Sequence, residues 1–309
     1  MGDASVASDR SKPTGTFGYP RSTVAADLVA IAAVGLVLVA VHALVPEPVQ
    51  DHLAFDHGAF APETLFAPGG FAGFVGLTLG ESQLDNLLTA AYVHANRGHL
   101  LSNLGGYVSL SLVTYLVCLQ ADRRRWFRLT FPLFLVVLPV AVNLTSYVVL
   151  EARFPGASPI SRGFSGVVAG FGGFLLAAVA VHLRTNYSRE TVFFVSQFAV
   201  LLLLGELLWI YAGGIGLVEG GAVALGLALA ISGIVSRTRE RSYGDDHYRK
   251  VGFDLLYVGL VLALLVWLVY GLFPADPISR GSFTNVFAHG AGFVEGGLLA
   301  ALAYVGVRA

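Results

Sequence analysis

The feature that most constrains this chain is a series of eight long apolar stretches. They cover residues 22–45, 99–119, 129–150, 165–183, 192–212, 214–236, 251–273 and 286–307. A helix of about 20 apolar residues, rising 1.5 Å per residue, crosses a hydrocarbon core about 30 Å thick. We therefore expect an all-α polytopic membrane protein with eight transmembrane helices.

The composition agrees with this interpretation and excludes other classes. Of the 309 residues, 55% are hydrophobic and 13% are charged, whereas soluble domains average about 25% charged residues. So little charge cannot cover a soluble globule of this size, which excludes a cytoplasmic α/β enzyme and a disordered chain. The net charge of −1 argues against a nucleic-acid binder. The single cysteine, Cys118, excludes an internal disulfide and a cysteine-clustered metal site.

The positive residues predict how the chain is oriented in the membrane. With eight spans both ends of the chain lie on one side, and that side carries 15 of the 19 Lys and Arg residues. Cytoplasmic loops are enriched in these residues, so we expect a multi-pass protein of the cell membrane with both termini in the cytoplasm. Residues 1–21 are predicted to be a disordered cytoplasmic tail, and residues 22–309 a single membrane domain.

Three polar clusters lie at the outer ends of spans two, four and eight. They are His94 to Asn103, Gly163 to Gly166 and Ala288 to Gly292. Polar residues within membrane spans are costly and are candidates for function. The clusters contain a serine at a helix N-terminus, histidines, and amide or imidazole donors, which are the groups that acyl transfer needs.

Two stripes of small residues predict that spans four and eight pack closely. One stripe is Gly166, Gly170 and Gly173, and the other is Ala288, Gly292, Gly296 and Ala300. Such stripes let two membrane helices approach each other, which would bring the ends carrying the serine and the histidine side by side. Each signal alone has an ordinary structural explanation, namely a chance Gly-x-Ser-Gly string, plain helix packing or a hydrogen-bonded histidine. Their combination at one depth favours a functional site.

The three motifs together resemble those of rhomboid intramembrane serine proteases of prokaryotic type. The matching residues are His94, His99 and Asn103 in span two, Gly163-Phe164-Ser165-Gly166 in span four, and Ala288-His289 with Gly292 and Gly296 in span eight. The resemblance covers about residues 25–185 and 250–307. An acidic exterior and scarce lysine would suit a salt-loving prokaryote such as a haloarchaeon.

The resemblance implies a serine endopeptidase that cleaves transmembrane segments of other membrane proteins near their extracytoplasmic end. Ser165 would be the nucleophile and His289 its general base, without a third acid. The backbone N–H of Ser165, together with Asn103 and His99, would form the oxyanion hole. The residues that would support this site are His94, Gly163, Gly166, Gly292 and Gly296. No cofactor or metal is implied, and the partners are membrane-protein substrates and the lipid bilayer.

The chain departs from the family pattern at three points. Asp85-Asn86 stands where the family has Trp-Arg, and Ala169 stands where an aromatic residue often stacks on the catalytic histidine. The family has a six-helix core, so the two surplus spans are interpreted as an inserted hairpin, 192–236.

Other polar residues suggest further interpretations. In the inserted hairpin, Glu206 and Glu219 are predicted to lie at equal depth, where they form an interhelical hydrogen bond, recognise a partner or carry protons. Glu295 is expected to face away from Ser165. The Asp51-His52 and Asp56-His57 pairs are interpreted as parts of a solvated acidic loop rather than as a metal site.

Two alternative functions stay open at this point. One is a non-proteolytic rhomboid-like protein that binds membrane helices or serves in quality control, and the other is a small-solute transporter that uses Glu206 and Glu219.

Residues 66–79, which are apolar but too short to span, are expected to lie in the interface at the outer side of the membrane.

Overall fold

The protein is built almost entirely of helices. The computed structural model describes residues 15–16, 18–60, 83–156, 159–212, 214–239, 245–279 and 282–308. Eight helices in these ranges are long and apolar enough to cross a membrane. They are α1 (Arg21–Leu44), α6 (Arg97–Gln120), α7 (Arg124–Arg153), α8 (Ser165–Asn186), α9 (Arg189–Ala212), α10 (Leu217–Arg239), α11 (Asp245–Leu272) and α12 (Val286–Arg308). The prediction of an all-α chain with eight potential spans is confirmed.

The remaining described elements are short. The helices are α2 (Glu47–His52), α5 (Asn86–Thr89) and the 3₁₀ turn η1 (Ala90–Tyr92), and the strands are β1 (Gly15–Thr16), β2 (Tyr19–Pro20), β3 (Phe55–Asp56), β4 (Ile160–Ser161), β5 (Ile278–Ser279) and β6 (Ser282–Phe283). The strands form three antiparallel pairs, β1–β2, β3–β4 and β5–β6. The tail predicted for residues 1–21 lies mostly outside the described residues, and the segment 66–79 lies wholly outside them.

Several helices extend beyond the apolar stretches that predicted them. Helix α7 begins at Arg124 rather than at residue 129, and α11 begins at Asp245 rather than at residue 251. The predicted hairpin 192–236 corresponds to α9 and α10, which together run from Arg189 to Arg239. Apolarity determines which part of a helix lies in the hydrocarbon, whereas the backbone continues its hydrogen bonding into the polar region beyond it.

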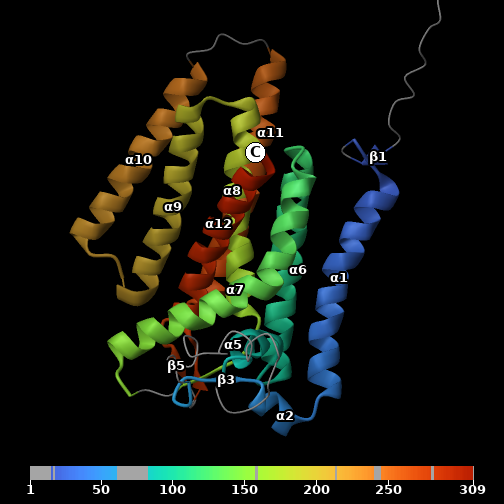
Figure 1. Ribbon diagram of the computed structural model, residues 1–309. Helices are drawn as coiled ribbons and strands as arrows, with labels where there is room; N and C mark the ends of the chain where they lie inside the picture. The colour runs from blue at the N-terminus through green and yellow to red at the C-terminus, as the bar shows by residue number, and fades with distance from the viewer. Residues whose placement is uncertain are drawn as a thin grey trace, which may run out of the picture.

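Helix α8 occupies the centre of the bundle, with 78% of its apolar stretch buried. It packs extensively against α12 and α6, and α12 packs in turn against α7. Helix α10 packs mainly against α9, and both lie at one side of the bundle, while α1 lies at the opposite side against α6 (Figure 1). The start of α1 and the end of α12 lie at the same end of the bundle, and α5, β3 and β5 lie at the other end (Figure 1). The α9–α10 hairpin is therefore peripheral to the helices that carry the candidate site.

Helices α8 and α12 touch through their backbones. A β-carbon on Gly292 would collide with the carbonyl oxygen of Gly166, and a β-carbon on Gly296 would collide with the Cα of Gly170. Gly173 meets the backbone of α12 in the same way, at Phe293. The two stripes of small residues thus face each other as their spacing predicts, and no side chain separates the two helices at these points.

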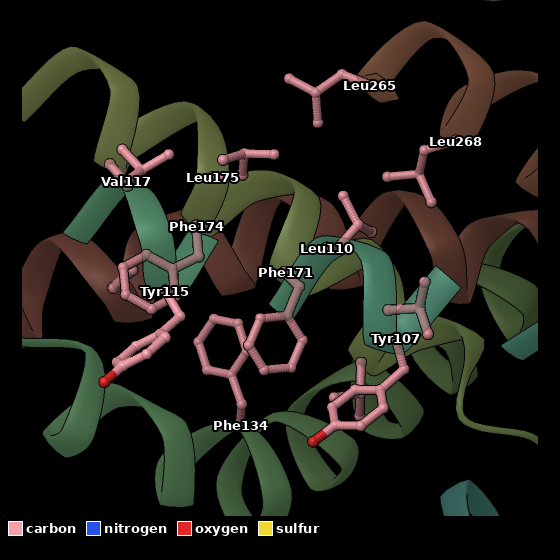
Figure 2. Packing of buried hydrophobic residues seen from close by; sticks show 14 of the residues in the cluster. Tyr107, Leu110, Tyr115, Val117, Phe134, Phe171, Phe174, Leu175, Leu265 and Leu268 are labelled. Carbon is pink, nitrogen blue, oxygen red and sulfur yellow. The ribbon is translucent and has the colours of Figure 1, made fainter. Parts of the chain in front are cut away.

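On its other face, α8 packs through aromatic side chains into the hydrophobic core. Phe171 and Phe174 point toward Phe134 of α7 (Figure 2), with ring centroids 5.0 and 5.7 Å from it. Tyr107 of α6 meets Phe171 edge-on at 5.8 Å, and its hydroxyl donates to the Ile31 carbonyl of α1 at 2.8 Å. These rings fix the rotation of α8, so that its glycine face is directed at α12.

A buried ion pair holds α1 at the end of the bundle opposite the candidate site. Asp27 is 8% exposed, accepts from Arg124 Nε at 2.6 Å and Nη2 at 2.9 Å, and accepts from the Tyr115 hydroxyl at 2.7 Å. A carboxylate in an apolar helix requires such partners. The sequence alone does not single out Asp27, because its partners lie in α6 and α7.

The close contact between α8 and α12 yields a prediction about stability. Replacing Gly296 by Ala puts a methyl group into the backbone of α8, so we expect the free energy of unfolding to fall by about 1–3 kcal/mol. Gly306 lies on the same helix with nothing within 4 Å of the added carbon, and Gly306→Ala should leave stability unchanged or raise it by up to about 1 kcal/mol. Equilibrium unfolding in detergent compares the two variants, and equal effects would contradict the importance of this contact.

Candidate active site

Ser165 and His289 lie within hydrogen-bond distance of each other at one end of the bundle. Ser165 is the first residue of α8 and His289 is in the first turn of α12. Ser165 Oγ and His289 Nε2 are 2.8 Å apart, although the two residues are 124 positions apart in the chain. Because Ser165 begins its helix, its backbone N–H is one of those that have no partner within the helix.

The tautomer of His289 follows from its second hydrogen bond. Its Nδ1 lies 2.6 Å from the carbonyl oxygen of Leu272. A carbonyl can only accept, so Nδ1 carries the proton and the neutral ring presents the lone pair of Nε2 to the Ser165 hydroxyl. Leu272 is the last residue of α11, where carbonyls lack helical partners and the helix dipole is negative. The ring is therefore oriented for accepting a proton from Ser165.

An aromatic contact to His289 comes from a part of the chain that the motif did not indicate. Ala169 is fully buried in α8 and has no ring to place against His289. The Phe273 ring instead meets the His289 ring edge-on, with centroids 6.0 Å apart. Sequence reasoning missed Leu272 and Phe273, because only the docking of α11 brings them to His289.

His99 and Asn103 lie beside the start of α8. A β-carbon at Gly163 would come within 2.5 Å of His99 Cε1 and 3.1 Å of Asn103 Nδ2. Gly163 has φ +117°, a conformation that other residues rarely adopt. The side-chain nitrogen of Asn103 is buried and has no hydrogen-bond partner among the described residues. The two side chains thus border the turn that leads into Ser165, with an amide donor available.

The His94 ring packs against the His99 ring. The two rings meet edge-on with centroids 5.3 Å apart. The side chain of Asn96 caps α6 by accepting from the His99 N–H at 2.9 Å, which fixes where this helix begins. His94 is buried, and burial lowers the pKa of its ring to about 3, so the ring is neutral at pH 7.

The segment between α7 and α8 is anchored to the segments before α6. The Gly163 N–H donates to the Ala90 carbonyl at 2.9 Å, and Arg162 Nη1 donates to Asp51 Oδ1 at 2.6 Å. The Asn86 side chain donates to the carbonyls of His52 and Ala54 at 2.8 and 2.7 Å. In this chain Asn86 thus links α5 to the loop after α2.

The acidic residues of the spans do not join the site. A β-carbon on Gly205 of α9 would meet Val223 of α10 at 3.2 Å, so the neighbouring Glu206 lies beside a part of α10 about one turn past Glu219. The prediction of equal depth is wrong, because α9 ends at Ala212 and α10 begins only at Leu217. Glu295 accepts from Thr145 of α7 at 2.5 Å, away from Ser165.

Comparisons with known proteins identify no relative of this chain. No family model, no curated protein and no solved structure matches the chain. The arrangement of the candidate site therefore stands on its own geometry.

His57, in the loop after β3, yields a prediction about pH. Burial lowers the pKa of His57 from 6.5 to about 4. The unfolded chain takes up a proton on this residue as the pH falls through about 6.5, while the folded protein does so only near pH 4. Stability should therefore decrease from pH 6.5 to pH 4.

Melting temperatures of the wild-type protein and of His57→Gln, measured in detergent between pH 7 and pH 4, test this origin. The variant should lose less stability over this interval. Some slope will remain because burial lowers the pKa of His94 in the same direction. Identical slopes in the two proteins would rule out His57 as a contributor.

Proposed function

We propose that this protein is a rhomboid-type intramembrane serine protease. The observation that carries the proposal is the 2.8 Å contact between Ser165 Oγ and the lone pair of His289 Nε2, with the tautomer set by the Leu272 carbonyl. The proposal is further supported by the motif resemblance and by the position of His99 and Asn103 beside the start of α8.

The proposed reaction proceeds through an acyl-enzyme. Ser165 Oγ attacks the carbonyl carbon of the scissile peptide bond while His289 Nε2 takes the hydroxyl proton. The Ser165 N–H, the Asn103 amide and the His99 ring donate to the oxyanion. The C–N bond then breaks as His289 protonates the leaving amine. Water, deprotonated by His289, hydrolyses the ester and releases Ser165.

The Leu272 carbonyl would take over part of the role that a carboxylate has in a serine–histidine–aspartate triad. It accepts the Nδ1–H, keeps the ring in one orientation, and interacts favourably with the imidazolium that forms during the reaction. A neutral carbonyl at a helix C-terminus does this without a buried charge, which is costly near the hydrocarbon.

In this proposal α8 and five further helices form the six-helix core, and α9–α10 is the inserted hairpin. The core helices are α1, α6, α7, α8, α11 and α12. The distribution of Lys and Arg supports cytoplasmic termini, so the site opens to the extracytoplasmic side of the cell membrane. The substrate is a transmembrane segment of another membrane protein, cleaved near its outer end.

The first test of this function removes the nucleophile. Ser165→Ala and His289→Ala should each abolish cleavage of a reconstituted transmembrane substrate while the melting temperature stays close to that of the wild type. A fluorophosphonate probe should label the wild type and not Ser165→Ala. Ser236→Ala, at the far end of α10, is the matched control and should cleave normally.

Retention of full cleavage by Ser165→Ala would refute the mechanism. A wild-type protein that binds transmembrane segments but neither cleaves them nor reacts with the probe would instead be a non-proteolytic membrane-helix-binding protein.

The second test concerns the oxyanion hole. Asn103→Ala removes one donor to the transition state, so kcat should fall about 10²–10³-fold, with KM within about twofold of the wild type. Asn103→Asp keeps the size but removes the donor, and it should lose at least as much activity. Wild-type kcat in both variants would exclude Asn103 from the oxyanion hole.

A further inference from the structure

A second hydrogen-bond network joins the two chain segments that carry Ser165 and His289. Its centre is Asn285, the residue before α12. Asn285 Oδ1 accepts from the Ala288 N–H at 3.1 Å, and the Asn285 carbonyl accepts from the His289 N–H at 3.4 Å. Asn285 therefore caps the turn that holds His289.

The same side chain reaches two other elements. Asn285 Nδ2 donates to Ser146 Oγ of α7 at 2.6 Å and to Ser161 Oγ of β4 at 3.0 Å. Since a backbone N–H can only donate, the contact with Ala288 identifies the other side-chain atom as the amide nitrogen. Its two hydrogens are thus both used, and Ser161 lies only four residues before Ser165.

His57 completes the network from the outer loop. Its Nε2 lies 2.8 Å from Ser161 Oγ. Because Ser161 Oγ already accepts from Asn285, its own hydroxyl is free to donate to the neutral His57 ring. Backbone pairing of β3 with β4, together with the His57 N–H bond to the Pro159 carbonyl at 3.2 Å, holds the two residues together. Ser161 is therefore fixed both by its backbone and by its hydroxyl.

We propose that Asn285 and Ser161 are positioning residues, which fix the first turn of α12, and with it the His289 ring, relative to the strand that leads to Ser165. This inference rests on the proposed protease function. Neither residue belongs to a motif of the sequence, and among the described residues neither side chain hydrogen-bonds to Ser165 or His289. Their effect is on alignment, since a misplacement of about 1 Å can cost about 10²-fold in rate.

Substitution of either residue breaks the hydrogen bond between Asn285 and Ser161. Asn285→Ser keeps a side-chain oxygen that can cap α12 but is too short to reach Ser146 and Ser161. Ser161→Ala removes the acceptor in β4, whereas Ser161→Thr keeps a hydroxyl. Thr145→Ala is the control, because it removes another hydroxyl contact between α7 and α12, to Glu295, outside the network.

Cleavage kinetics on a reconstituted transmembrane substrate give the first readout. Asn285→Ser and Ser161→Ala should lower kcat about 10–100-fold with KM within about twofold, and Ser161→Thr should restore most of the loss. Thr145→Ala should cleave like the wild type. Wild-type kcat in both Asn285→Ser and Ser161→Ala would overturn the proposal, as would a loss in Thr145→Ala of the same size. If one of the two variants does not fold, the other still decides.

A readout that does not need activity separates this inference from the proposed function. The proton on His289 Nδ1, bonded to the Leu272 carbonyl, should give an NMR resonance that His289→Ala removes. Asn285→Ser and Ser161→Ala should shift it, and Ser161→Thr should return it toward its wild-type position. A resonance that moves in this way in a protein without protease activity would keep the positioning role and refute the protease. An unmoved resonance in both variants of an active protein would refute the positioning role and keep the proposed protease function.

Discussion

The backbone contact between α8 and α12 is the constraint on which the candidate site depends. Lipid supplies no hydrophobic force to press two membrane helices together, so close packing of small residues must do so. Gly166, Gly170 and Gly292 allow the backbones to touch. Since Ser165 and His289 lie in the first turns of these two helices, their separation of 2.8 Å is a consequence of that contact.

The candidate dyad uses uncharged groups where soluble enzymes commonly use a buried carboxylate. The last carbonyl of α11 holds the ring of His289, and Asn285 and Ser161 link the flanking segments through neutral hydrogen bonds. One charged pair, Asp27 with Arg124, lies at the opposite end of the bundle, and another, Arg162 with Asp51, anchors the segment before Ser165 without contributing to the orientation of His289. A neutral carbonyl as the partner of His289 Nδ1 fits the cost of placing charge near hydrocarbon.

The helices of this protein follow from its sequence more directly than the contacts around the candidate site. Apolar length identified eight potential spans, and the small residues at intervals of three and four indicated which faces of α8 and α12 meet. The aromatic neighbour of His289 was not predictable from position 169, because it is Phe273, after the end of α11. Equal depth for Glu206 and Glu219 failed because four residues separate α9 from α10, and the hydrophobic pattern did not resolve that gap.

Whether a feature could be predicted from the sequence depends on the range of the interactions that produce it. Hydrophobic length and helical periodicity are local properties, so the sequence by itself determined the membrane class, the number of potential spans and the grouping of His99 with Asn103 on one helical face. Which carbonyl orients His289, and which side chains join β4 to α12, depends on how separate helices dock. Only the tertiary structure decided these contacts, because a hydrogen bond requires placement within a few tenths of an ångström that no local pattern encodes.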